Sequence, residues 1–172
     1  VVDKNLTFNI HGSDRFENST SPKFDALQIN SGVTLTLKGD LFIISNVTIN
    51  GTLDLNGYVL NVGPGASLTF GADGSIKGSA TSGIVYNATA NSNLKMASGF
   101  ESLDFVHVRN SGNLTLSTNL TIGGIARFSH TGNLVVGANT LTLTGSGLTA
   151  SSTGGLTSVS YTHLRAHETV LD

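Results

Sequence analysis

The sequence contains no cysteine and no tryptophan, and it has only two prolines and one methionine in 172 residues. Without cysteine, the chain can form neither disulfides nor thiolate metal sites. Charged residues make up only 12% of the chain and the formal net charge is −2, so we expect no binding to nucleic acid. No apolar run approaches the roughly 18 residues of a membrane span, so membrane insertion is not expected either.

The feature that is present is repetition, in the form of a four-residue block with leucine at its second position. The blocks are TLTL at 34–37, TLDL at 52–55, SLTF at 67–70, NLKM at 93–96, NLTL at 113–116 and NLVV at 133–136. A second series of apolar pairs, such as Leu41 with Ile43 and Leu141 with Leu143, follows several of these blocks at a short, similar offset. Two short strands in each unit of about 20 residues is the pattern of a coiled solenoid.

Within each block the apolar residues alternate with polar ones, which is the period of a half-buried strand. Between the blocks stand turn pairs such as Asn50-Gly51 and Asn56-Gly57, which would also suit the two-residue loops of antiparallel hairpins. A repeat of about 20 residues has no reason to occur in a sandwich, whereas stacked coils bury each leucine on its copy in the next coil. We therefore predict an all-β parallel β-helix, or β-solenoid, and keep an antiparallel β-sandwich as the alternative.

The organisation follows from where this alternation holds. Residues 1–25 are expected to form a strand, a long charged loop at 11–25 and part of a first coil, and residues 26–145 the solenoid repeats. Within the repeats, residues 80–92 are interpreted as a loop insertion that accounts for the longest spacing between blocks. Residues 146–158 are predicted to be a linker or the start of another coil. The chain begins VVDKNLTFNI, with no initiator methionine and no signal pattern, so we expect its natural N-terminus to be missing.

The strings GVTLTLKGDLFI, VTINGTLDLNGYVLNVG and TGNLVVGANTLTLTG resemble the repeat regions of bacterial cell-surface and secreted β-solenoid proteins. These include adhesin-like proteins, such as those secreted by the type IX route, and autotransporter passengers. The resemblance covers about residues 26–145. It implies an extracellular or cell-surface location and a role in adhesion or display, with an extracellular polysaccharide or a host or matrix surface as partner. No catalytic motif is carried over with it.

The last residues differ from everything before them. VSYTHLRAHET, at 159–169, resembles the translation of adapter DNA from sequencing libraries, matching over eleven consecutive residues. We therefore interpret residues 159–172 as a tail of non-native origin and expect the natural protein to continue differently. His163 and His167, four residues apart, would otherwise suggest a metal pair on a short helix, and this reading is set aside with the tail.

The remaining candidate sites are few. Asp54 and Asp73 lie about one coil apart and could form a carboxylate pair, while Asp104 precedes His107 closely enough for a polar relay. His130 stands in a predicted corner, and the segment GADG at 71–74 matches a fragment of glycine-aspartate calcium repeats.

For each of these candidates, an ordinary surface role is the preferred interpretation. The aromatic residues occur about one per unit at alternating apolar positions, and we assign them mostly to the core. They are Phe42, Tyr58, Phe70, Phe100 and Phe105.

We therefore name no catalytic, cofactor-binding or metal-binding residue and expect no cofactor. The expected function is a non-enzymatic structural or adhesive segment of a larger bacterial surface or secreted protein, acting as a stiff stalk or display platform. The alternative is a fragment of a carbohydrate-active parallel β-helix, a polysaccharide lyase or hydrolase whose catalytic coils lie elsewhere.

Overall fold

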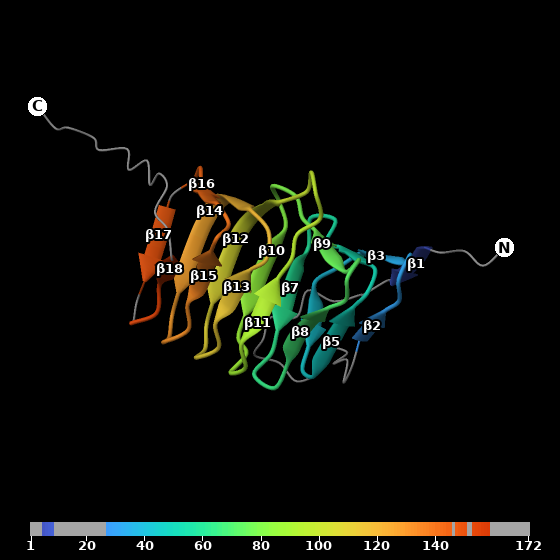
Figure 1. The fold of residues 1–172 in the computed structure, drawn as a ribbon, viewed down its shortest axis with the longest axis horizontal. Helices are drawn as coiled ribbons and strands as arrows, with labels where there is room; N and C mark the ends of the chain where they lie inside the picture. The colour runs from blue at the N-terminus through green and yellow to red at the C-terminus, as the bar shows by residue number, and fades with distance from the viewer. Residues whose placement is uncertain (1–4, 9–26, 146, 151–152, 159–172) are drawn as a thin grey trace, which may run out of the picture.

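The protein folds as a β-solenoid of about six turns, with coils of about 21 residues and parallel sheets throughout. The computed structural model describes residues 5–8, 27–145, 147–150 and 153–158. Figure 1 shows the coils following one another from the N-terminal to the C-terminal end of the molecule. The described residues contain no helix, and therefore none that is long and apolar enough to span a membrane. The predicted solenoid is confirmed.

The strands fall into four parallel sheets. The longest, which we call the long sheet, contains β4 (Leu41–Ile43), β7 (Val59–Val62), β10 (Gly83–Tyr86), β12 (Ser102–Val108), β14 (Leu120–Phe128), β16 (Leu141–Leu143) and β17 (Gly147–Ala150). A second sheet contains β1 (Asn5–Phe8), β3 (Thr34–Leu37), β6 (Thr52–Asp54) and β9 (Ser75–Lys77). The other two contain β2 (Leu27–Ile29), β5 (Asn46–Ile49) and β8 (Ser67–Phe70), and then β11 (Ser92–Leu94), β13 (Leu114–Leu116), β15 (Leu134–Gly137) and β18 (Leu156–Ser158).

The register places each residue on its counterpart one coil away. In the long sheet, Leu60 pairs with Ile84, Ile84 with Val106, and Val106 with Ala126. All of these pairings are parallel, which excludes the antiparallel sandwich for the described residues.

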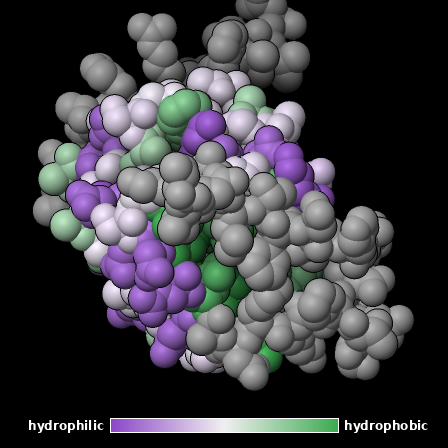
Figure 2. Space-filling model, turned by 90° about the vertical axis from the view of Figure 1, so that its right-hand side faces the viewer, coloured by the Kyte–Doolittle hydropathy of each residue, from purple (hydrophilic) through white to green (hydrophobic). Residues whose placement is uncertain are grey.

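The interior is a continuous apolar column because the inward residues of successive coils stack on one another. Leu53 is fully buried between Leu35 and Ile76, its partners on the two neighbouring strands. A view onto the end of the solenoid nearer the N-terminus shows hydrophobic residues at the centre and hydrophilic residues along part of the rim (Figure 2). Each coil therefore contributes one layer to a shared core, as expected for a repeat architecture.

The alignment of the repeated blocks is right for two pairs of leucines and wrong for others, among them Leu94, which pairs with Leu116 and not with Leu114. Leu35 pairs with Leu53, and Leu114 with Leu134, as the repeat predicts. Leu68 does not pair with Leu53, however, because it lies on a different side of the solenoid and pairs with Val47. The same short block serves on more than one side of a coil, so sequence similarity alone cannot distinguish the sides.

The predicted loop insertion at 80–92 is also wrong. Residues 83–86 form β10, a regular strand of the long sheet, in which Ile84 and Tyr86 are fully buried. The longest spacing between blocks, from Leu68 to Leu94, runs between β8 and β11, which contact each other in neighbouring coils, and β10 lies between these two strands along the chain. The predicted loop at 11–25 lies outside the described residues, as do residues 159–172 with His163 and His167.

One corner of the later coils is held by an asparagine column, made of Asn91, Asn113 and Asn133. The side-chain oxygen of Asn91 accepts a hydrogen bond from the backbone of Asn113 at 2.9 Å, and that of Asn113 accepts one from Asn133 at 3.0 Å. The oxygen of Asn133 in turn accepts from the backbone of Gly155, also at 3.0 Å. Backbone donors that the turn leaves without strand partners are thereby satisfied by the preceding coil.

A glycine precedes each residue whose backbone donates to the asparagine column: Gly112 precedes Asn113, Gly132 precedes Asn133 and Gly154 precedes Gly155. A Cβ atom built on Gly132 would lie 2.3 Å from the carbonyl oxygen of Asn110 and 2.4 Å from that of Gly112. The chain therefore approaches the preceding coil too closely for any side chain. This contact explains the recurring Ser/Thr-Gly-Asn triplets at 111–113 and 131–133, a sequence signal that the leucine blocks alone do not capture.

Candidate functional site

The outer face of the long sheet carries side chains that were not expected together. His107 of β12 lies between Val85 of β10 and Arg127 of β14, its Cα partners on the two neighbouring strands. All three point away from the core, because the residues beside them on their strands, such as Val106 and Ala126, are buried. His107 is half-buried, whereas Arg127 is exposed.

A register irregularity between β12 and β14 decides which residues of β12 face outward. The register between β12 and β14 shifts between Leu103 and Phe105, so Leu103 and Val106 both point inward although they are three residues apart. Strict alternation would have placed Phe105 on the same side as Leu103. Asp104 of β12 instead lies opposite two residues of β14, Gly123 and Gly124, and beyond this irregularity Phe105 and His107 point outward, which is how bulges redirect side chains.

His107 contacts a serine one coil further along. Its Nε2 lies 2.6 Å from Oγ of Ser129, which directly follows β14. Arg109 lies beside Ser129, because the backbone of Ser129 donates to the carbonyl of Val108 at 3.0 Å. We call His107, Arg109, Arg127 and Ser129 the basic cluster.

The electrostatics of the basic cluster keep its histidine neutral. Burial, followed by the positive charges of Arg109 and Arg127, lowers the pKa of His107 to about 4. At neutral pH the ring is therefore an uncharged hydrogen-bonding group, and the two guanidinium groups carry the positive charge. A base with so low a pKa is poorly suited to activating a serine hydroxyl at neutral pH.

Next to the basic cluster lies an apolar platform formed by Phe105 and Ile125, which are Cα partners on β12 and β14. A Cβ atom on Gly83 would lie 2.3 Å from two ring carbons of Phe105, so this ring lies directly against the glycine of β10. Both platform side chains are half-buried. The assignment of Phe105 to the core is wrong, and so is that of Phe100, which is 44% exposed. Phe42 is also outside the core, because Leu41 and Ile43 on either side of it are the buried residues of β4.

Formal charge is distributed unevenly along the chain around this site. Residues 27–104 contain three Lys and five Asp or Glu, a net charge of −2, whereas residues 105–158 contain no Asp or Glu and two Arg, a net charge of +2. Those two arginines are Arg109 and Arg127. Along the chain the basic cluster therefore begins directly after the last two carboxylates of the described residues, Glu101 and Asp104, and Asp104 lies on β12 together with His107.

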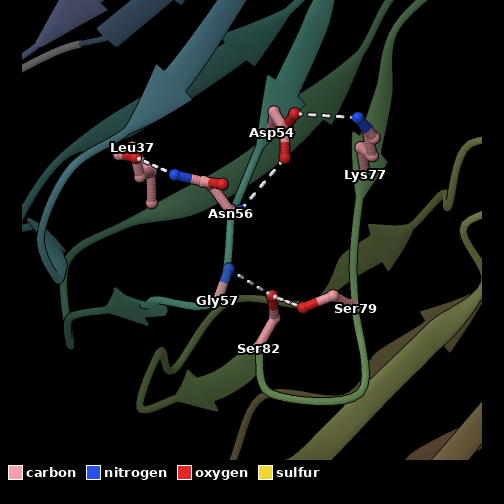
Figure 3. Close-up of polar contacts among 7 residues, drawn as sticks. All are labelled: Leu37, Asp54, Asn56, Gly57, Lys77, Ser79 and Ser82. Carbon is pink, nitrogen blue, oxygen red and sulfur yellow. Dashed lines mark hydrogen bonds and ion pairs between the residues drawn. The ribbon is translucent and has the colours of Figure 1, made fainter.

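The structure does not bring Asp54 and Asp73 together as a pair. Asp54 Oδ2 forms an ion pair with Lys77 Nζ at 3.0 Å, while Asp73 accepts a hydrogen bond from the hydroxyl of Ser31 at 3.3 Å. The other carboxylate oxygen of Asp54 accepts from the backbone of Asn56 at 3.0 Å (Figure 3). Asn56 has a φ of 50°, a conformation that asparagine tolerates better than most residues.

The same corner continues into the following coil. The backbone of Gly57 donates to the hydroxyl of Ser82 at 3.1 Å, and this hydroxyl lies 2.9 Å from that of Ser79 (Figure 3). Lys77 also lies over the ring of Phe100, at 4.4 Å from its centre. Asp54 therefore lies in a polar network that joins neighbouring coils.

The remaining candidates are also placed apart from one another. Asp104 does not contact His107 in a relay, since its carboxylate lies against the backbone of Gly124 and the histidine nitrogen contacts Ser129. His130 Nδ1 lies 3.2 Å from the hydroxyl of Thr131. The GADG segment forms a tight turn whose Ala72 carbonyl accepts a hydrogen bond from Lys95 Nζ at 2.6 Å, which places a positive charge where a calcium ion would bind. No three His, Asp or Glu side chains among the described residues are grouped so as to hold a metal ion.

Comparison of the chain with protein-family models, with curated proteins and with solved structures finds no match. The features of the chain that bear on function are its fold, the outer face of the long sheet and the character of the repeats.

Proposed function

We propose that this chain is a non-enzymatic structural or adhesive segment of a larger bacterial surface or secreted protein, where it acts as a stiff stalk or display platform. The observation that carries the proposal is the uninterrupted stacking of about six coils on one apolar core. At the usual spacing of about 4.8 Å between strands, six coils make a rod of roughly 29 Å. More coils of the same kind would lengthen it without changing its cross-section.

Two further features support this proposal. The side chains that join neighbouring coils, such as the asparagine column, bind backbone groups rather than leaving polar atoms free for a substrate. The resemblance of the repeats to bacterial surface and secreted solenoids supports an extracellular location, where a cysteine-free protein with few charges is common.

The alternative of a carbohydrate-active β-helix is favoured by one observation, the contact between Ser129 and His107. A serine and a histidine at this distance can act as nucleophile and base. The pKa of about 4 leaves the imidazole a weak base, however. We therefore propose that the outer face of the long sheet binds a partner rather than transforms it.

The mechanical part of the proposal is tested by pulling single molecules of the full chain between their ends. Since each coil contacts only its neighbours, we expect a series of unfolding events, each releasing roughly 70 Å of chain for a coil of about 21 residues. Extension at negligible force, without distinct events, would contradict a load-bearing role.

The location and the lack of catalysis are tested separately. Antibodies against the chain should label intact, unpermeabilised cells of the source bacterium or its culture medium, and labelling only after permeabilisation would overturn the location. Incubation of the full chain with neutral and acidic polysaccharides should release neither reducing nor unsaturated sugars. Sustained turnover would favour the enzymatic alternative.

A further inference from the structure

The outer face of the long sheet combines groups that suit one kind of ligand. Two guanidinium groups, from Arg109 and Arg127, flank a neutral imidazole and a hydroxyl group. The planar fork of arginine matches the two oxygens of a carboxylate, and Ser129 and His107 add hydrogen-bonding groups at fixed positions. The cluster is therefore complementary to carboxylate groups in its charge and in its hydrogen-bonding groups.

The apolar platform beside the basic cluster indicates that the ligand also has an apolar face. Phe105 and Ile125 lie two residues before His107 and Arg127 on the same two strands, so the platform is about 7 Å from this pair. Its half-buried ring is held against Gly83 and presents a flat apolar surface. A ligand that covers both parts has an apolar face and an acidic group within one or two units, as the ring of a uronic acid does.

The open shape of the site favours a polymer over a single sugar. A solvent-exposed ion pair contributes little to affinity, so one acidic sugar would bind weakly. A chain that contacts several strands at once gains from the high effective concentration of its linked units. Nucleic acid fits less well, because two cationic side chains provide few of the phosphate contacts that such binding requires.

We propose that the basic cluster and the apolar platform together bind a carboxylated polysaccharide lying across β12 and β14. This inference deepens the proposed function by naming the class of extracellular partner, and it rests on that function only for the setting in which the polymer is met. The carboxylates lie on Arg109 and Arg127, and a sugar ring lies on Phe105.

The test uses the full chain and a pair of polymers with one backbone. Binding to polygalacturonate is measured by calorimetry or biolayer interferometry at low salt, and compared with fully methyl-esterified polygalacturonate, which lacks the charges. We expect binding to the acidic polymer that weakens as salt is added, and at least tenfold weaker binding to the ester. Equal affinity for the two polymers, or no binding to polygalacturonate at low salt, would overturn the proposal.

Variants locate the site. We expect R109Q and R127Q each to weaken binding roughly three- to tenfold, and the double variant to remove it at the concentrations used. The matched control is K38Q, which removes one positive charge from an exposed position after β3 and should leave affinity unchanged. F105A should weaken binding roughly threefold without altering its salt dependence. An equal loss in K38Q would show that only net charge matters and would overturn the site.

Binding to single-stranded DNA of comparable charge is measured in the same way, to test whether the site prefers a polysaccharide to a nucleic acid. Tighter binding to DNA than to polygalacturonate would overturn the assignment of the ligand class.

Failure of the polysaccharide-binding proposal can be distinguished from failure of the proposed stalk function. Failure to bind the polymer, together with labelling of intact cells, would remove this inference and leave the stalk intact. Binding accompanied by cleavage of the polymer would keep the site and overturn the non-enzymatic function.

Discussion

Replacement of Gly132 by alanine tests how tightly the coils are stacked. The added Cβ atom would lie 2.3 Å from the carbonyl oxygen of Asn110, whereas real Cβ contacts essentially never fall below 3.0 Å. The chain would have to retreat by about 0.7 Å, and neither of the two nearest atoms belongs to a side chain that could move aside. The hydrogen bond from the backbone of Gly132 to the same oxygen, now 2.9 Å long, would stretch to about 3.6 Å and be lost.

The cost follows from these two effects. A lost backbone hydrogen bond accounts for about 1 kcal/mol, and overpacking of a rigid contact for about 1 to 3 kcal/mol. We therefore expect Gly132→Ala to lower the free energy of unfolding by roughly 2 to 4 kcal/mol. The change is measured by urea denaturation of the full chain, followed by far-ultraviolet circular dichroism.

The matched control is Gly155→Ala. A Cβ atom at Gly155 would meet nothing within 4 Å, and no unusual φ is required there. This substitution should be neutral, or stabilising by up to about 1 kcal/mol through the unfolded state. Equal effects of the two substitutions would refute the argument that the corner contact, rather than glycine content as such, sets the spacing of the coils.

Three further substitutions test the core, the cluster and the polar corner. Leu53→Ala should cost roughly 2 to 5 kcal/mol, because the side chain is fully buried between two coils; a loss below 1 kcal/mol in urea denaturation would contradict a close-packed interior. His107 has a folded-state pKa of about 4, below the ordinary 6.5, so the unfolded chain binds more protons between these values and stability falls as the pH falls through them. Allowing for its partial exposure, we expect the wild type to lose about 1 kcal/mol more than His107→Gln between pH 7 and pH 4, and parallel curves would contradict the desolvated site. A double-mutant cycle with Asp54→Asn and Lys77→Met should give a coupling energy of about 0.5 to 1 kcal/mol, which high salt should reduce.

The fold could be predicted from the sequence because two signals agree. The repeat of about 20 residues and the alternation of apolar and polar residues both arise from the stacking of like residues in successive coils. Leu35 on Leu53 and Leu114 on Leu134 are pairings that a reader of the repeats would draw. The side on which a block lies could not be predicted, since a buried leucine on one side looks like a buried leucine on another. For this reason the repeat alignment places Leu68 on the wrong side, and the prediction of a loop at 80–92 misses the strand at Gly83–Tyr86.

The candidate site was harder to predict because it depends on the register irregularity between β12 and β14, where Asp104 faces Gly123 and Gly124. In the sequence LDFVHV, alternation from Leu103 assigns Phe105 to the interior, and only the shift in register shows that Val106 takes that place. The sequence does carry a hint one coil later, where Gly123 and Gly124 mark the corresponding irregularity in β14. The approach of His107 to Ser129 joins residues 22 positions apart, which becomes visible only when the coils are in register.

The asparagine column has a consequence for the order in which the coils form. At each step, the side chain of the earlier coil accepts a hydrogen bond from the backbone of the later one, from Asn91 to Asn113 and then to Asn133. A later coil therefore adds to acceptors that are already fixed, much as a new layer adds to the face of a growing crystal. If a chain emerges with its N-terminus first, whether from a ribosome or from a membrane pore, each coil can pack on a preceding coil that is already folded. Layer-by-layer addition of this kind would also oppose backward sliding through a pore, so folding itself would act as a ratchet.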